Sequence, residues 1–148
     1  MFKKITIIAM ALVVAIIIIP PALYFYTLSM LEGMPVRPSN ISLTQAQLNE
    51  LWENNEKYSS VSDIGSITPY WIYKWLIPVM VNDYFSYSGI DPYKNMSRMA
   101  SAIAIHHMRT NQVKTKGMGW WHLLHVNLSI WLQRHWTPKE IAIKSSEI

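Results

Sequence analysis

The chain opens with a long apolar run, and a mixed polar and apolar sequence follows it. No charged residue occurs between Ile5 and Leu31, and Ile5–Ile19 is almost entirely apolar. Because a helix rises about 1.5 Å per residue, roughly 20 residues cross the hydrocarbon core of a bilayer. Two lysines precede the run, and no other basic residue follows before Arg37. By the positive-inside rule, this pattern predicts a single membrane-spanning helix with a cytoplasmic N-terminus.

A cleaved signal peptide is the alternative interpretation of the same run. The apolar core of a signal peptide is usually only about 7–15 residues long and ends at a cleavage site of small residues. Here the run continues through Pro20-Pro21 into Tyr24-Phe25-Tyr26, which is typical of the aromatic belt at a membrane interface. We therefore expect an uncleaved anchor, with the Pro pair kinking or unwinding its outer end.

The rest of the chain shows helical periodicity and no strand pattern or repeat. After a Pro-containing connector at Gly33–Asn40, a capping box at Ser42–Gln45 predicts the start of a helix. An apolar stripe that includes Trp52 predicts that this helix continues to an end near Asn54-Asn55. The Ser-rich stretch Tyr58–Thr68 is expected to be a loop.

Three further helices complete a predicted all-α fold. Asp91-Pro92 can cap and begin a helix that runs to about Thr110. Another helix is expected at Trp120–His135, with an apolar stripe on one face. A polar line on the adjacent face consists of His122, His125 and Ser129. Thr137 and Pro138 then begin a short terminal helix.

The aromatic segment Pro69–Met80 has two interpretations. Trp71 and Trp75 lie four residues apart, so they share one face if the segment is a core helix. Trp and Tyr also favour the headgroup region of a bilayer, and the anchor holds this segment near the membrane. An interfacial helix is therefore the alternative.

Charge is divided unevenly along the chain. Residues 32–91 carry three basic and seven acidic side chains, which gives −4, whereas residues 92–148 carry eight basic and two acidic, which gives +6. A basic half of this kind is compatible with a solvated surface, with anionic lipid headgroups or with a pyrophosphate-linked substrate. Nucleic acid is not expected on the exported side of a membrane. The absence of Cys excludes disulfides and thiol chemistry.

Four stretches of the chain together resemble a known family. They are Asn82–Pro92, which ends in Gly-Ile-Asp-Pro, then Ile103–Asn111, Trp121–His125 and Arg134–Ile141. In their order and approximate spacing, over about residues 69–143 and behind a membrane anchor, they resemble the bacterial family 51 glycosyltransferases, which polymerise peptidoglycan. The resemblance implies a lysozyme-like helical lobe, here truncated, on the outer side of the inner membrane.

The positions that this family uses as catalytic acids differ here. Counting back from Gly89-Ile90-Asp91, Met80 occupies the place of the catalytic Glu, or Asn82 does if a two-residue gap is allowed. Neither side chain can act as a Brønsted base toward a sugar hydroxyl. His125 occupies the position at which the family has its second catalytic Glu. Asp83 is the one nearby carboxylate and the candidate for a shifted catalytic role; otherwise no catalytic residue is assigned.

Several matched positions hold imidazoles instead. We expect a ligand-binding cleft between the helices at residues 92–110 and 120–135, lined by His106, His107, Arg109, Asn111, His122 and His125. Two helices that each present His could also hold zinc, copper or haem through His106, His107, His122 and His125. Because no HExxH motif, Cys or neighbouring carboxylate accompanies them, structural or solvated histidines are favoured and no cofactor is predicted.

These observations predict a single-pass bacterial inner-membrane protein with three parts: a cytoplasmic start and anchor at residues 1–31, a connector and helix at 32–68, and a transglycosylase-like domain at 69–148 on the periplasmic side. The expected function is a non-catalytic pseudo-transglycosylase that contacts membrane lipid and binds lipid-linked glycan or a protein partner. The alternatives are an accessory subunit of a membrane complex, which makes its contact through Tyr70–Trp75, and an active glycosyltransferase that uses Asp83.

Overall fold

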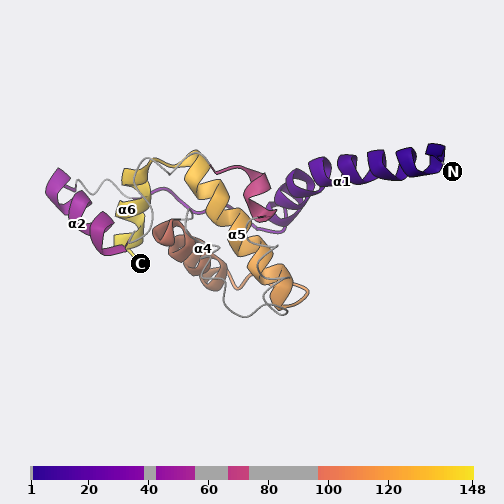
Figure 1. The fold of residues 1–148 in the computed structure, drawn as a ribbon. Helices are drawn as coiled ribbons and strands as arrows, with labels where there is room; N and C mark the ends of the chain where they lie inside the picture. Colours follow the sequence, from indigo (N-terminus) through magenta and orange to yellow (C-terminus); the bar gives the residue numbers. More distant parts are fainter. Residues whose placement is uncertain (1, 39–42, 56–66, 74–96) are drawn as a thin grey trace, which may run out of the picture.

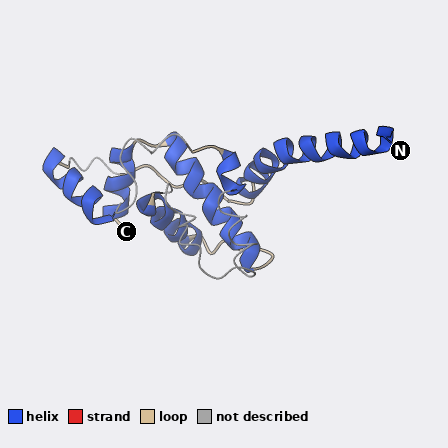
Figure 2. Ribbon diagram, viewed as in Figure 1, coloured by secondary structure: helices blue, strands red, loops and turns tan. Residues whose placement is uncertain are grey.

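A computed structural model describes residues 2–38, 43–55, 67–73 and 97–148. Its elements are all helical: α1 (Phe2–Leu28), α2 (Gln45–Asn55), the 3₁₀ turn η2 (Pro69–Trp71), α4 (Arg98–Thr110), α5 (Met118–His135) and α6 (Pro138–Ser146). No strand occurs among the described residues (Figure 2), so the all-α prediction is confirmed. α1 projects from a small body that contains α4, α5, α6 and η2, with α2 at the opposite end (Figure 1).

α1 is a single helix long enough and apolar enough to cross a membrane. The candidate span is Lys3–Leu28, and the large apolar side chains between Ile5 and Ile19 are exposed. The helix stays α-helical through Pro20 and Pro21, so the unwinding expected there does not occur. A helix with the length and composition predicted for a membrane span is therefore present.

Two tyrosines explain why the helix stays intact at the proline pair. Pro has no N–H, so Pro20 and Pro21 cannot donate to the carbonyls of Ile16 and Ile17 four residues earlier. The Tyr73 hydroxyl donates to Ile16 O at 2.6 Å, and the Tyr70 hydroxyl donates to Ile17 O at 3.0 Å. Both carbonyls freed by the prolines therefore have a hydroxyl partner from the η2 region.

The last turns of α1 belong to the core of the helical body. Tyr24, Thr27 and Leu28 are buried, and α1 packs on α5. The Nδ2 of Asn127 in α5 donates to Thr27 Oγ1 at 2.8 Å, a bond buried on both sides. The membrane-spanning candidate and the body thus share one continuous helix and one core.

The helices α4 and α5 form the main packed pair of the body. Their contact is the largest between any two elements among the described residues. It buries apolar side chains of both helices, among them Met99, Ala104, Met108, Leu124 and Leu128. α6 adds Ile141 and Ala142 to the same core.

The start of α4 differs from the predicted one. Asp91-Pro92 lies outside the described residues, and the described helix begins at Arg98. Ser97 is its N-cap, because its backbone is not helical (φ −57°, ψ 123°) and its side chain accepts from Ala100 N. A helix that is continuous from Pro92 to Thr110 is therefore wrong.

The end of α4 is a Schellman motif. Gln112 has a positive φ of 48°, its N–H bonds to Arg109 O at 3.1 Å, and the N–H of Val113 bonds to Met108 O at 3.0 Å. Val113 is packed against the core, as the hydrophobic residue of this motif usually is. The turn sends the chain toward α5, which starts at Met118, two residues before the predicted start.

The capping box of α2 lies two residues later than predicted. Thr44 and Gln47 form it: the N–H of Thr44 donates to Gln47 Oε1 at 3.0 Å, and Gln47 N donates to Thr44 Oγ1 at 3.3 Å. The Ser42–Gln45 prediction is therefore wrong, because α2 begins at Gln45 and its third residue is Gln47. The helix extends to Asn55, the last described residue of this segment, so its predicted end near Asn54-Asn55 stays a prediction.

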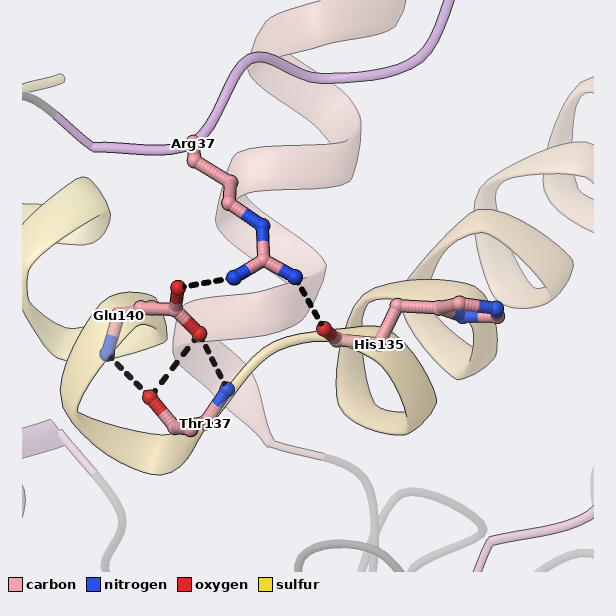
Figure 3. A network of polar contacts seen from close by, with 4 residues as sticks. All are labelled: Arg37, His135, Thr137 and Glu140. Atoms are coloured by element: carbon pink, nitrogen blue, oxygen red, sulfur yellow. Dashed lines mark hydrogen bonds and ion pairs between the residues drawn. The ribbon is translucent and has the colours of Figure 1, made fainter.

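Arg37 connects the connector after α1 to the junction of α5 and α6 (Figure 3). It pairs with Glu140 and donates from Nη2 to His135 O at 3.0 Å, a carbonyl at the C-terminal end of α5. Thr137 and Glu140 form a reciprocal capping box that begins α6, as predicted for Thr137 and Pro138. One arginine thus holds the connector, the end of α5 and the start of α6 together.

Candidate functional site

The six predicted ligand-binding residues do not come together in one place. His106, His107 and Asn111 of α4 line a groove toward α6, whereas the imidazole of His125 lies in the contact between α4 and α5. His122 is half-buried on α5, one turn before His125. Arg109 is exposed and does not line the groove. Because the α4–α5 contact is filled by apolar side chains, the six residues do not line one cleft between these two helices.

The groove has a volume of about 280 Å³ and is formed by α4, α6 and the connector. Its polar lining comes from His106, His107, Thr110, Asn111, Lys144 and Glu147, and its apolar lining includes Val36 and Ile103. Lys144 Nζ lies 2.8 Å from Glu147 Oε2, so the cation carries a carboxylate partner. The groove therefore offers hydrogen-bond donors and acceptors with little net charge.

His107 is held by neighbours at both ring nitrogens. Its Nε2 lies 3.0 Å from Gly33 O, and its Nδ1 lies 3.1 Å from Asn111 Nδ2. The carbonyl can only accept, so Nε2 carries the proton and Nδ1 accepts from the Asn111 amide. This neutral tautomer fixes the connector against α4. His106 makes one contact, 3.3 Å to Thr110 Oγ1, and is exposed at the groove edge.

The polar line of α5 is part of a buried polar seam between α4 and α5. We use this name for Ser97, Ser101, His125, Ser129 and Gln133. His125 Nε2 lies 2.7 Å from Ser101 Oγ, and Gln133 Oε1 accepts from Ser97 N at 3.1 Å. Ser129 Oγ donates to His125 O at 2.8 Å, and Gln133 Nε2 donates to Ser129 O at 3.1 Å. The bonds of His125 to Ser101 and of Gln133 to Ser97 join the two helices inside an otherwise apolar interface, and the other two bonds lie within α5.

Burial makes His125 a neutral imidazole. Its pKa is lowered to about 4, first by loss of solvation, then by the nearby charge of His122, with the Ser101 contact acting in the opposite direction. The Trp121 ring lies 5.7 Å from its ring, centroid to centroid. A hydroxyl 2.7 Å from an imidazole nitrogen has the distance of a nucleophile and its base. However, Nδ1 has no hydrogen-bond partner among the described residues, so no carboxylate there orients the ring.

The histidine pairs do not converge on a metal geometry. Across the described ranges, no three His, Asp or Glu side chains lie close enough to share an ion. None of the groove-lining residues belongs to the polar seam. The candidates Met80, Asn82 and Asp83 lie outside the described residues.

Sequence reasoning missed six polar residues of the groove and the seam: Ser97, Ser101, Thr110, Gln133, Lys144 and Glu147. Gln133 follows Ser129 by four residues and extends the His122–His125–Ser129 line, so the helical period could have identified it. Ser101 gave no such signal, because its role depends on how α4 packs against α5. Lys144 reaches the groove only through the placement of α6.

Comparison with known proteins gives no match. No protein-family model, curated protein or solved structure is significantly similar to the chain. The resemblance to family 51 glycosyltransferases therefore rests on the four sequence stretches described above.

Proposed function

We propose that the chain is a single-pass membrane protein whose exported, transglycosylase-like domain binds a lipid-linked glycan without polymerising it. The observation that carries this proposal is the continuity of α1, which runs from its exposed apolar stretch into the core of the body. A domain joined in this way stays close to the bilayer surface, where the sugar of a lipid-linked ligand lies. The lysines before the apolar run favour an exported body.

The seam supports a non-catalytic role. The position of the family's second catalytic Glu is occupied by His125, which is 5% exposed and has a pKa of about 4. Two of the described carboxylates already have partners. Glu140 forms part of the α6 capping box, and Glu147 pairs with Lys144. Asp83 is the residue on which an active enzyme would depend.

The groove supplies the groups that would bind the ligand. Its volume of about 280 Å³ is near the lower end of the range of small-molecule pockets, about 300–1,000 Å³, and suits one sugar or phosphate group rather than a glycan chain. His106 and Asn111 can hydrogen-bond to hydroxyls, and Lys144 can approach an anionic oxygen by exchanging its Glu147 partner. A lysozyme-like lobe around this groove is part of the proposal.

The test uses full-length protein in lipid nanodiscs that contain a lipid-linked disaccharide. We expect saturable binding without glycan synthesis, and weaker binding by His106→Ala and Asn111→Ala. His135→Ala is the matched control, because His135 is equally an exposed imidazole but stacks on Trp131, with ring centroids 4.5 Å apart, outside the groove. Equal binding by all three variants would contradict a site in the groove.

Two other outcomes would change the proposal. Glycan chains that form with the parent protein and are lost with Asp83→Asn would identify an active glycosyltransferase. A stoichiometric membrane partner recovered in mild detergent, without glycan affinity, would identify an accessory subunit. In that case Tyr70–Trp75 is a less suitable contact than the sequence implies, because Trp71 is buried and the Tyr70 hydroxyl is bonded to α1.

A further inference from the structure

The connection between α4 and α5 ends in an exposed patch that combines apolar and basic side chains. We call residues 113–120 the α5 tip. Met118 is 71% exposed, and Lys114 and Lys116 beside it are exposed. The Trp120 ring contacts the Tyr26 ring of α1 edge-on, with centroids 5.7 Å apart. The tip therefore contacts the last turns of α1, where this helix joins the body.

The length of α1 brings the bilayer surface to this patch. The exposed apolar stretch Ile5–Ile19 has 15 residues, which span about 22 Å against about 30 Å of hydrocarbon. About five further residues are needed, so the hydrocarbon would end near Tyr24-Phe25 if the helix is close to upright. Phe25 is 68% exposed and Tyr26 is 49% exposed, as expected of side chains at the interface. The part of the body around Tyr24-Phe25 then lies at the level of the headgroups, and the Tyr70 and Tyr73 side chains reach into the outer hydrocarbon at Ile17 and Ile16.

The α5 tip lies at the edge of the body from which α1 projects. In Figure 1 the N-terminal end of α5 points to the side from which α1 projects, whereas α2 and α6 lie at the other end. The tip is also well ordered, because the Schellman motif at Gln112 fixes its start and Thr115 Oγ1 donates to Gly117 O at 3.1 Å. Its apolar and basic side chains thus have a defined direction.

Charge favours an anionic partner at this edge. Between Pro92 and Lys139 the sequence contains no Asp or Glu. The two ion pairs found in the described part of the chain use Arg37 and Lys144, so neither occupies Arg109, Lys114 or Lys116. Basic side chains beside an exposed Met and a half-buried Trp are compatible with a segment that binds an anionic membrane surface.

We propose that the α5 tip, with Phe25 and Tyr26 of α1, is a second membrane contact that binds the surface of a bilayer containing anionic phospholipid. This inference rests on the proposed anchoring by α1 and adds the orientation of the body. The body lies with the α5 tip in the headgroup layer, and α2 and α6 face away from the membrane. Continuity with α1 and the excess of basic side chains favour a bilayer over a protein at this patch.

The chain has no Cys, so single-cysteine variants of the full-length protein can be labelled at one site. We would attach the fluorophore NBD to Met118→Cys, with Lys116→Cys as a second tip position. Lys139→Cys on α6 is the matched control, because it is also an exposed lysine. Val13→Cys, within the exposed part of α1, reports the anchor itself. Each variant is reconstituted in vesicles of phosphatidylcholine with phosphatidylglycerol, and lipids doxyl-labelled near the headgroup or deep in the chain serve as quenchers.

The proposal predicts a blue-shifted emission and loss of fluorescence with the shallow quencher at Met118 and Lys116, and neither change at Lys139. The loss should decrease when phosphatidylglycerol is omitted or when Lys114→Gln is added to the Met118 variant. A Met118 label that is as water-exposed as the Lys139 label would overturn the second contact. Because deep quenching at Val13 tests the anchor separately, a failure there would contradict the proposed function instead.

Discussion

His125 shows how burial determines the properties of a single residue, because it is 5% exposed and hydrogen-bonded to Ser101. A catalytic Glu, which the proposed resemblance would place at this position, would instead have to be ionised and reachable by substrate. The neutral ring can share one proton with the serine hydroxyl without carrying a charge into the core. The residue thus stabilises the α4–α5 contact in the form that carries no charge.

The stability of the protein should therefore fall in mild acid. The unfolded chain binds a proton at His125 below about pH 6.5, but the folded chain does so only below about 4, so stability is complete above 6.5 and is lost as the pH falls toward 4. Between pH 7.5 and 5 we expect a loss of about 2 kcal/mol in the free energy of unfolding, measured by denaturant titration in detergent micelles. His125→Gln should remove most of this pH dependence, and the control His135→Gln should keep it. A parent protein equally stable at both pH values would contradict a buried neutral His125.

At the scale of elements, α1 and the η2 region depend on each other. A proline pair inside a helix leaves two carbonyls without partners, and an unpaired carbonyl near the hydrocarbon layer is costly. Here the hydroxyls of Tyr70 and Tyr73 take the place of the missing N–H groups. The two bonds hold residues 69–73 against α1. These residues therefore pack into the core through Trp71 and also lie beside the apolar part of α1.

A double-mutant cycle tests this dependence. Tyr73→Phe should lower the free energy of unfolding by about 1–2 kcal/mol, because Ile16 O loses its donor. Pro20→Ala restores an N–H for the same carbonyl, so Tyr73→Phe should cost much less in that background. Tyr70→Phe with Pro21→Ala gives an independent second cycle. Additive effects in both cycles, measured by thermal unfolding in nanodiscs, would show that the hydroxyls do not replace the proline N–H groups.

The end of α4 offers a second test at this scale. Gln112 adopts φ 48°, a conformation that costs a residue with a Cβ roughly 1 kcal/mol and costs glycine nothing sterically. Gln112→Gly should therefore raise the free energy of unfolding by about 0.5–1 kcal/mol. Lys114→Gly, at a nearby exposed residue without a positive φ, should be neutral or destabilising. A loss of stability in Gln112→Gly would show that the Gln side chain matters more than the backbone.

Periodicity and capping chemistry predicted much of the fold. The apolar run, α5 and α6 follow from patterns within one segment, such as Thr137 and Pro138 at the start of α6. The start of α4 at Ser97 and the capping box of α2 at Thr44 differ from the predicted ones because more than one polar residue near each start satisfies the same capping rule, Asp91 and Ser97 in one case and Ser42 and Thr44 in the other. The bonds from Tyr70 and Tyr73 to α1 could not be predicted, because they join positions more than 50 residues apart. The candidate site was limited in the same way: periodicity located the polar line of α5, but not its burial against Ser101.

In the whole molecule, the anchor and the body form one structure rather than two joined parts. Tyr24, Thr27 and Leu28 contribute to the core, and the buried bond from Asn127 to Thr27 ties α5 to the same turn. Cleavage after Leu28 would therefore remove core side chains, whereas cleavage before Tyr24 would leave them in place.

Two deletions separate the membrane part of α1 from its core part. Removal of residues 2–19 should leave a folded body, because Tyr24, Thr27 and Leu28 remain. Removal of residues 2–28 should cost about 5 kcal/mol, from two buried apolar side chains at about 2 kcal/mol each and an unpaired Asn127 amide at about 1 kcal/mol or more. That loss is comparable with the whole stability of a small domain. Circular dichroism melting and limited proteolysis would distinguish the two forms; equal stability would contradict a shared core.

The continuity of α1 also determines how the body can move. A domain on a flexible tether tumbles on its own, and a fluorophore on it loses its polarisation quickly. In the membrane-anchored protein that we propose, the helix that enters the bilayer is the helix that the body packs around, and the carbonyls freed by its Pro pair are bonded to Tyr70 and Tyr73. The body should therefore turn only when the anchor turns, at the slow rate set by membrane viscosity. The body would therefore approach a ligand from one fixed side. It would reach a membrane-bound ligand only by lateral diffusion in the plane of the membrane.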